Sequence, residues 1–420
     1  MNPLTYVVVN VSIIALIWIG GVRVNQGALT QGQVVALYNY MSQILVELIK
    51  LANLIINITK ALACAGRIQS IFDVKPGMQD GTAGVKESDD EVPVVEFKNA
   101  ALTYSGAGDT SIAGVSFKAY RGQTIGIIGG TGSGKSSLVG LIPRFYDATE
   151  GEVLIDGVNV KDIKLEELRD KVGIVMQKAV LFKGSIRNNM QVAKQDATDG
   201  EIDEALAIAQ AKEFVDKKDG RLDYMIEQGG KNLSGGQRQR IGIARTLALR
   251  PEFIVCDEPI SALDVSIQAQ VINLLEKLQR ERGFSYLFIA HDLEMVYHIS
   301  HKIGVMYLGN MVELGSSDDV YKKPLHPYTR ALISAAPIAD PHLAKEKKRI
   351  ILKGEVPSPL NPPVGCPFAG RCRYASESCR QKKPEIYEYD NRKVACNLYS
   401  PENLAKYKAV GKTPEQILAE

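Results

Sequence analysis

The hydrophobic pattern divides the chain into an apolar start and a longer, mixed remainder. Residues 4–22 contain no charged side chain, and residues 34–58 are apolar apart from Glu47 and Lys50. Each segment is long enough to cross a bilayer core of roughly 30 Å as a helix. The two charges are three positions apart, so they share a helix face and can pair or line a cavity. The pattern predicts two transmembrane helices rather than the buried helices of a soluble protein.

Basic residues indicate how these two segments would lie in a membrane. Their short connection carries only Arg23, whereas Lys60, Arg67 and Lys75 follow the second segment. Because positive residues favour the cytoplasmic side, we expect both ends of the pair in the cytoplasm. The region at Met1 has neither the basic start nor the small-residue cleavage site of a secretory signal, so we expect no cleaved leader.

Beyond residue 93, short apolar runs alternate with longer mixed stretches, as is typical of strands buried on both faces of a parallel sheet. These runs fall at residues 124–128, 172–176, 253–256 and 286–290. The pattern predicts an α/β fold with a helical subdomain, preceded by two apolar helices and followed by a loop-rich tail. We place the regions at 1–60 for the helices, 61–92 for a polar linker, 93–316 for the α/β domain and 317–420 for the tail.

A glycine-rich run joins the apolar run 124–128 to a helix-like stretch that begins at Ser137. It is Gly129-Gly130-Thr131-Gly132-Ser133-Gly134-Lys135-Ser136, the phosphate-binding pattern GxxxxGK[ST] in its strand–loop–helix setting. Glycines let backbone N–H groups surround an anion, and the following helix presents its positive end to that anion. Lys135 can reach the β- and γ-phosphates, and the Ser136 hydroxyl can bind Mg²⁺. The run predicts a nucleotide site rather than a chance turn.

Two carboxylates, Asp257 and Glu258, directly follow the apolar run 253–256. Open α/β sheets bind ligands at the carboxyl ends of their strands, where both acids would meet the phosphates. Phosphoryl transfer depends on positioning and charge neutralisation more than on covalent chemistry. We therefore assign both acids to the nucleotide site, in preference to two solvated acids at a strand end.

A second motif narrows the class of nucleotide-binding protein. Leu233-Ser234-Gly235-Gly236-Gln237 lies about a hundred residues after the phosphate loop, and the two together resemble the ATP-binding cassette (ABC) family. The resemblance implies that this signature motif contacts the γ-phosphate held by an opposite subunit, with Ser234 supplying a hydroxyl. It also implies an ATPase that converts ATP and water to ADP and phosphate. Its ligands would be ATP and Mg²⁺, and its active form a homo- or heterodimer.

The resemblance assigns roles to single residues as well. Asp257 matches the Mg²⁺ carboxylate of the Walker B motif, and Glu258 matches the general base that polarises the attacking water. Gln177 matches the Q-loop glutamine near Mg²⁺ and the membrane domain, and His291 matches the switch histidine that senses the γ-phosphate. We count Glu258, His291 and Gln177 as catalytic, and Ser136, Gln177 and Asp257 as Mg²⁺ ligands.

Two further matches concern the dimer and the adenine base. Asp264, in the stretch Ser261-Ala262-Leu263-Asp264, matches the D-loop that crosses the dimer interface. Tyr104 matches the aromatic residue that stacks on adenine, although one tyrosine near a strand end is more often a packing residue. We expect nucleotide contacts from Tyr104, from the phosphate loop through Ser137, from the signature motif and from Asp264.

The two halves of the chain resemble different ABC proteins. Residues 1–232 resemble the last two membrane helices, the linker and the first half of the nucleotide domain of a bacterial exporter-type (multidrug or lipid) half-transporter. The supporting stretches are Ala65-Gly66-Arg67-Ile68, Arg144-Phe145-Tyr146-Asp147, residues 182–189 and Glu227. Residues 240–400 resemble the ATP-binding subunit of an oligopeptide or dipeptide importer. Its supporting stretches are residues 257–266, 290–293, 326–332 and 354–359.

These resemblances imply a transporter component in a bacterial inner membrane, with its ATPase domain in the cytoplasm. The expected cargo is a peptide, drug or lipid, and the expected partners are permease subunits and a substrate-binding protein. An exporter half-transporter has six membrane helices where two are present here, and an importer ATPase normally has none. The alternative is a recombined or truncated membrane-tethered ATPase that does not transport by itself. The uncharged run 4–22 disfavours a third possibility, a soluble ABC protein acting outside transport.

Four cysteines add one further prediction, since Cys366, Cys372, Cys379 and Cys396 all lie in the tail. Four thiolates suit Zn²⁺ or an iron–sulfur cluster. Their spacing is not that of paired zinc-ribbon cysteines. It resembles the cysteine-rich tail of peptide importer ATPases, which favours a cluster over zinc, and either over unliganded thiols. A cytoplasmic location argues against structural disulfides.

Composition changes this picture little. The formal net charge is +2 and the pI about 8.0, so nothing suggests a nucleic-acid surface and no nucleic-acid partner is expected. The two remaining cysteines, Cys64 and Cys256, are interpreted as small packed residues.

Overall fold

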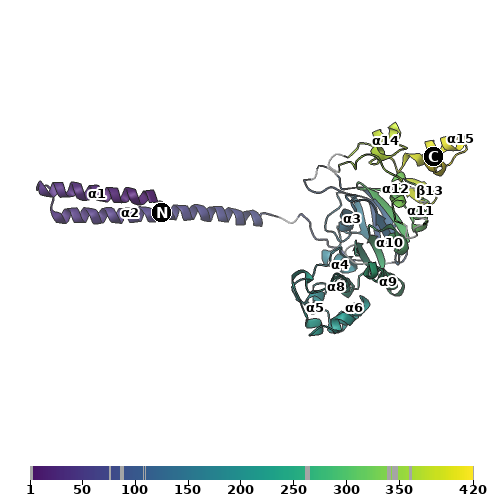
Figure 1. The fold of residues 1–420 in the computed structure, drawn as a ribbon, viewed down its shortest axis with the longest axis horizontal. Helices are drawn as coiled ribbons and strands as arrows, with labels where there is room; N and C mark the ends of the chain where they lie inside the picture. The colour runs from purple at the N-terminus through teal and green to yellow at the C-terminus, as the bar shows by residue number, and fades with distance from the viewer. Residues whose placement is uncertain are drawn as a thin grey trace. The chain divides into compact units, whose positions relative to one another are not determined.

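The computed structural model of the chain forms two compact units, Met1–Gln79 and Asp80–Glu420 (Figure 1). It describes residues 3–74, 77–85, 89–106, 108, 110–260, 265–337, 342, 349–358 and 362–419. Each unit has its own set of elements. The finer division into four regions stays a prediction.

The first unit is a helical hairpin of α1 (Pro3–Asn25) and α2 (Gln31–Phe72), which confirms the two predicted apolar helices. Thr30 fixes the start of α2, because its side chain accepts a hydrogen bond from the Gln33 N–H while the Gln33 side chain accepts one from the Thr30 N–H. Figure 1 shows α1 lying along the first part of α2. The second part of α2 continues beyond α1 as a single helix.

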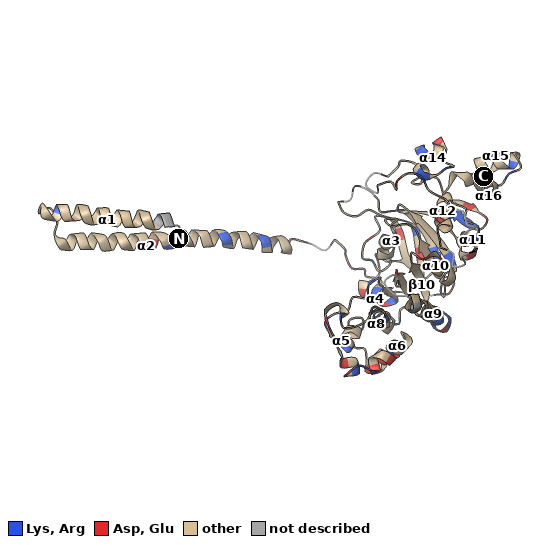
Figure 2. Cartoon of the chain, viewed as in Figure 1, with Lys and Arg blue, Asp and Glu red and all other residues tan. Residues whose placement is uncertain are grey.

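The hairpin carries its apolar side chains on the outside. Trp18 is 74% exposed and Leu62 is 68% exposed, and α2 has no buried residue in its described length. Both helices are long and apolar enough to cross a membrane. Figure 2 shows how sparse charged residues are along them. The Lys50 Nζ lies 2.7 Å from the Glu47 carboxylate, so the predicted pairing of these two charges is confirmed.

The second unit is built on a mixed sheet with the strand order β13-β14-β12-β11-β3-β10-β9-β6. Its parallel strands are β6 (Val172–Val175), β9 (Phe253–Asp257), β10 (Ser285–Ile289), β3 (Thr124–Ile128) and β11 (Lys302–Tyr307). The antiparallel side consists of β12 (Asn310–Ser316), β14 (Arg392–Val394) and β13 (Tyr387–Tyr389). All four apolar runs therefore form adjoining parallel strands, as the sequence predicts.

A second, antiparallel sheet contains β2 (Ile112–Ala119), β1 (Val95–Leu102), β4 (Glu150–Ile155) and β5 (Val158–Asn159) in that order. Side chains from both sheets form one apolar cluster, in which Phe97 stacks on Phe117 at 4.6 Å between ring centroids. The fold is thus the predicted α/β domain, with β3 buried along its whole length.

Helices cover the mixed sheet and form a subdomain. The covering helices are α3 (Lys135–Leu141), α4 (Leu165–Lys171), α8 (Gly235–Ala248), α9 (Val265–Arg282) and α10 (Leu293–Ile299). The subdomain comprises α5 (Ile186–Gln191), α6 (Asp199–Ile208) and α7 (Lys212–Asp216), with the short ribbon of β7 (Gly184–Ser185) and β8 (Met225–Ile226). This arrangement confirms the predicted helical subdomain.

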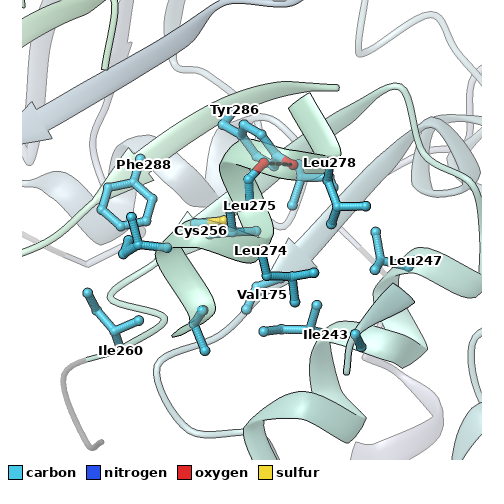
Figure 3. Packing of buried hydrophobic residues seen from close by; sticks show 14 of the residues in the cluster. Val175, Ile243, Leu247, Cys256, Ile260, Leu274, Leu275, Leu278, Tyr286 and Phe288 are labelled. Carbon is cyan, nitrogen blue, oxygen red and sulfur yellow. Dashed lines mark hydrogen bonds between the residues drawn. The ribbon is translucent and has the colours of Figure 1, made fainter. Parts of the chain in front are cut away.

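The core beneath α8 and α9 explains one of the two isolated cysteines. Cys256 is fully buried beside Tyr286 and Phe288, and the Tyr286 hydroxyl donates to the Leu275 carbonyl at 3.1 Å (Figure 3). Cys256 is therefore the small packed residue that the sequence suggests. Cys64 is not, because it is exposed on α2, where no neighbouring element covers it in the described part of the chain.

The tail is fixed to the same sheet. Its elements are α11 (Ser317–Lys322), α12 (Pro327–Ser334), η3 (Ala369–Arg371), α14 (Glu377–Gln381), β13, β14, η4 (Asn397–Tyr399), α15 (Pro401–Ala409) and α16 (Pro414–Ala419). The buried carboxylate of Glu313 on β12 accepts the N–H groups of Leu325 and His326 at 2.9 Å each, and Arg392 lies 3.8 Å away. Breaking such a buried ionic contact by removing one partner is costly, so the start of α12 is held firmly against β12.

Candidate nucleotide site

The phosphate loop connects β3 to α3 in a backbone conformation that needs glycine at two positions. Gly134 precedes α3 with a φ of 94°, and a Cβ there would lie 2.8 Å from the Ser111 carbonyl oxygen. A Cβ on Gly129 would lie 2.3 Å from the Met306 carbonyl oxygen, a contact that no side chain can make. The glycines therefore let the loop bend closely against β11 and the start of β2.

Lys135 is the buried cation of the loop. It is 7% exposed, and its Nζ donates to the carbonyls of Gly129 at 2.8 Å and Gly130 at 3.1 Å. Burial lowers the pKa of Lys135, and the nearby carboxylates of Glu258 and Asp257 act in the opposite direction. The ammonium group thus lies inside the loop, close to both predicted acids.

Two oxygen donors meet beside this lysine. Burial together with the charge of Glu258 raises the pKa of Asp257 at the end of β9, and the neighbouring Ser136 hydroxyl acts in the opposite direction. A hydroxyl beside a carboxylate is a donor set that fits Mg²⁺, which prefers oxygen ligands and is usually held by few protein groups. The Ser133 hydroxyl is buried with no hydrogen-bond partner in the described residues, which fits a loop built to surround an added anion.

Glu258 brings three strand ends together. Its Oε2 accepts a hydrogen bond from Gln177 Nε2 at 2.9 Å, and its Oε1 lies 2.7 Å from His291 Nε2. Gln177 follows β6 and His291 follows β10, the two neighbours of β9 in the parallel sheet. The Glu258 backbone has a φ of 49°, an uncommon left-handed conformation for a residue other than glycine. All three residues assigned as catalytic therefore meet at the carboxyl ends of adjacent strands.

Lys135, Glu258 and His291 border a cavity of about 300 Å³, which Gln177 and Asp257 do not line. Its lining from the predicted site consists of residues 131–137, Glu258 and His291. Five residues that the sequence analysis missed complete it, namely Thr110, Ser111, Leu308, Gly309 and Pro362. Gly309 supports the loop directly, because its N–H donates to the Ser133 carbonyl at 2.9 Å. The sequence signal for Gly309 is a turn glycine between two apolar runs. This signal does not indicate that the turn lies next to the phosphate loop.

Tyr104 lies next to the loop but is engaged in other contacts. Its hydroxyl donates to the Ser137 hydroxyl at 2.9 Å, and its ring packs edge-on against Tyr146 with 4.9 Å between centroids. It is half-buried. Both the adenine-stacking role and the packing alternative remain open for this residue.

The signature motif begins α8. Ser234 caps the helix by accepting the Gln237 N–H at 3.2 Å, and the Gln237 side chain accepts the Ser234 N–H at 3.1 Å. Leu233 is buried, while Gly235 and Gly236 form the first residues of the helix. Among the described residues these five do not line the phosphate cavity of their own chain. Asp264 lies outside the described residues, so its predicted place at a dimer interface stays a prediction.

The four tail cysteines lie around one cavity of about 490 Å³, together with Phe368. Burial raises the pKa of Cys366, raises that of Cys372 to about 11, and raises that of Cys396 further. Without a cation these thiols are therefore neutral at physiological pH. The donor set is that of a zinc or iron–sulfur site, but in the described part of the chain no group of three or more ligands is arranged to hold a metal ion.

Comparison with known proteins agrees with this geometry. Residues 112–261 match the family model described as ABC transporter, and residues 312–379 match the oligopeptide/dipeptide transporter C-terminal region. The oligopeptide transport ATP-binding protein OppF of Haemophilus influenzae is 45% identical over 294 residues, which cover 68% of this chain and 88% of OppF. AppF of Bacillus subtilis, which has the same description, is 43% identical over 298 residues, covering 69% of this chain and 90% of AppF.

A solved structure of a bacterial Atm1-family ABC exporter with ATP bound is also similar. It superposes with a TM-score of 0.58 at 29% identity, covering 71% of this chain. This chain spans 52% of that exporter, about half its length. The importer relatives cover more of this chain than residues 240–400, so the importer and exporter resemblances overlap within the nucleotide domain that both families share.

The phosphate loop, the paired acids and the signature helix thus occur in one α/β domain, and relatives matched over most of their length have the same domain and tail. The predicted resemblance, fold and ATPase class are confirmed. The chain belongs to the ATP-binding proteins of ABC transporters, a family of ATPases, and carries the oligopeptide/dipeptide transporter type of C-terminal region.

Proposed function

We propose that this chain is the ATPase subunit of a peptide transporter, and that it hydrolyses ATP to drive transport through membrane subunits. The observation that carries the proposal is the convergence of Gln177 and His291 on Glu258, next to the buried Lys135. The oligopeptide/dipeptide type of tail and the oligopeptide transport relatives support peptide as the cargo.

Each residue has a distinct part in the proposed reaction. Lys135 would neutralise charge on the phosphates, and Ser136 with Asp257 would hold the metal ion. Mg²⁺ would supply positive charge that offsets the charge developing on the transferred phosphoryl group. Glu258 orients and polarises the attacking water, while Gln177 and His291 hold its two carboxylate oxygens. Phosphoryl transfer requires the attacking water and the phosphates to be held in position in this way.

The proposed active form is a dimer in which two chains share each ATP. The signature motif lies about a hundred residues after the phosphate loop, and its residues do not line the phosphate cavity of their own chain. Ser234 would therefore complete the cavity of a partner chain. Mixing a Ser234→Arg chain with a Lys135→Ala chain should restore one intact composite site. Recovery of ATPase activity in the mixture supports the dimer. Turnover strictly first order in protein, with no recovery, contradicts it.

The proposed location is the bacterial inner membrane, with the ATPase unit in the cytoplasm. The support is the hairpin of α1 and α2, whose apolar side chains are exposed over lengths that suit a bilayer. Separate permease subunits and a substrate-binding protein are the proposed partners. No nucleic-acid partner is proposed, since the net charge is only +2.

Reconstitution in liposomes tests transport. The purified chain should hydrolyse ATP in the presence of Mg²⁺ and accumulate no peptide by itself. Accumulation should begin when oligopeptide permeases and a binding protein are added. Accumulation by the chain alone would overturn the need for permeases. ATPase activity without accumulation, with or without the permeases, favours the second candidate, a membrane-tethered ATPase that does not transport. The presence of a two-helix hairpin on an importer-type ATPase also favours this candidate.

We also propose that the cysteine cavity holds an iron–sulfur cluster, with zinc as the alternative. The support is that four partly buried thiols border a single cavity. A cluster spans more space than one ion, so it suits ligands that are not arranged around a single point. Anaerobic purification should give brown protein containing iron and sulfide, whereas colourless protein with zinc indicates the alternative. Protein with neither metal would leave the thiols unliganded.

A further inference from the structure

A tyrosine of the tail touches the phosphate loop. Tyr328, the second residue of α12, accepts a hydrogen bond from the Gly130 N–H at 2.9 Å through its hydroxyl oxygen. The two residues are 198 positions apart. Tyr328 is 5% exposed, whereas Gly130 is exposed, so the hydrogen bond is partly buried. The tail therefore reaches the nucleotide site through a hydrogen bond from a buried side chain.

The peptide group that Tyr328 contacts also holds the loop lysine. The Gly130 N–H and the Gly129 carbonyl belong to the same planar peptide group. Tyr328 binds its N–H side, and Lys135 Nζ donates to its carbonyl side at 2.8 Å. Because glycine stands on either side of it, this peptide group can rotate more freely than a peptide group between any other two residues. A partner on each side restricts that rotation.

Tyr328 is itself rigidly placed. The His326 Nδ1 caps α12 by accepting the Tyr328 N–H at 3.1 Å, and burial lowers the pKa of His326 to about 3, so it stays neutral and able to accept. The tyrosine ring packs against Tyr307, with 4.6 Å between centroids, and against Phe368 at 5.5 Å. Its hydroxyl therefore has little freedom to leave the loop.

We propose that Tyr328 is a positioning residue that orients the Gly129–Gly130 peptide group and so prepares the phosphate loop for ATP. The inference rests on the proposed ATP site. Bound phosphates hold the loop by themselves, so the contribution of Tyr328 is made before ATP binds. Its loss should raise the KM and the dissociation constant for ATP and change kcat little.

Tyr328→Phe tests this in the full chain, because it keeps the ring and removes the hydroxyl. Loss of the one hydrogen bond to the Gly130 N–H should weaken ATP binding about three- to tenfold. We expect a KM raised by the same factor and a kcat within about twofold. Amide exchange at Gly130 should be slow in the parent protein and faster in the variant.

Tyr307→Phe is the matched control. Tyr307 is 4% exposed and belongs to the same ring cluster, but its hydroxyl has no hydrogen-bond partner among the described residues. This variant should leave the KM unchanged. Equal effects in both variants, or an unchanged KM in a folded Tyr328→Phe chain, would overturn the inference.

Two further outcomes keep the proposals separate. If Tyr328→Phe does not fold, rapid exchange of the Gly130 amide in the parent protein would still contradict the inference. A parent chain that binds no ATP would contradict the proposed function itself. Normal ATP binding in both variants would contradict only the role of Tyr328.

Discussion

The phosphate cavity and the cysteine cavity lie in the same unit but are assembled in different ways. The first takes half of its lining from residues 131–137, in the phosphate loop and the first turn of α3, and the rest from the ends of β9 and β10 and from residues 110–111, 308–309 and 362. The second gathers four thiols from loops and short elements between residues 366 and 396. A site centred on one continuous loop has much of its geometry set locally, whereas a site gathered from several loops depends on how the whole tail packs.

The cavities also differ in charge. The phosphate cavity holds an ammonium group and carboxylates, so it is prepared for a charged ligand. The cysteine cavity brings four thiols together, and burial raises the pKa of Cys366 and Cys372, so these two thiols carry no charge until a metal displaces their protons. Changes to one cavity should therefore leave the chemistry of the other intact, and the following variants test this separation.

Glu258→Gln should have the largest effect. Removing the carboxylate that polarises water should lower ATP hydrolysis by roughly 10²- to 10⁴-fold. ATP binding should persist, because Lys135, Ser136 and Asp257 remain. Phosphate release and equilibrium ATP binding measure the two effects. Turnover close to that of the parent protein would remove Glu258 from its assigned role.

Lys135→Ala should come next. A buried ammonium group that contacts phosphate contributes about 1.5–3 kcal/mol through charge-assisted hydrogen bonds, so ATP binding should weaken roughly 10- to 100-fold. Titration with ATP and Mg²⁺ measures it. The metal content of the tail serves as the control, and a parallel loss of metal would mean that the two cavities are not separate.

Cys372→Ser should affect the other cavity alone. Loss of one of four thiol ligands should remove most bound iron or zinc, while the dissociation constant for ATP should stay within about twofold. Metal analysis and ATP titration of the same sample give both values. A tenfold loss of ATP affinity would show that the tail controls the loop more strongly than its single hydrogen bond to Gly130 implies.

Asp257→Asn should have the smallest effect, a rise in the apo-protein Tm of about 1–2 °C at pH 7. Burial raises the pKa of Asp257, so the folded state binds its proton more tightly than the unfolded state does. The resulting stability is present below the ordinary Asp pKa and is lost as the pH rises through the raised value. The advantage of the variant should therefore vanish at acidic pH. Thermal melts at both pH values measure it.

The sequence indicated which candidate nucleotide-site residues lie close together, because the signals for them are local. The glycine-rich run, the acids after β9 and the histidine after β10 each follow an apolar strand, and parallel pairing brings them to one edge. The Ser234 and Gln237 spacing likewise anticipates a helix start. In each case the pattern and the geometry lie within a few residues of each other.

The parts that the sequence missed depend on contacts between distant segments. Gly309 and Pro362 reach the cavity from loops far from the motif, and Tyr328 contacts Gly130 across the sheet. The strand β14 is only three residues long, too short for a periodic pattern, yet it joins the tail to β12. Such contacts depend on tertiary packing, and the spacing of residues within a local motif does not predict them.

The left-handed backbone conformation of Glu258 opposes the stability of the fold to the proposed catalytic role of this residue. A φ of 49° at a residue with a side chain costs on the order of 1–3 kcal/mol. The backbone at this position would suit glycine, and the chemistry requires a carboxylate. The hydrogen bond from the Glu258 N–H to the Ile289 carbonyl at 2.9 Å helps to hold the unfavourable angle in place. Selection for stability alone would therefore favour glycine at this position, and the proposed role in hydrolysis accounts for the glutamate.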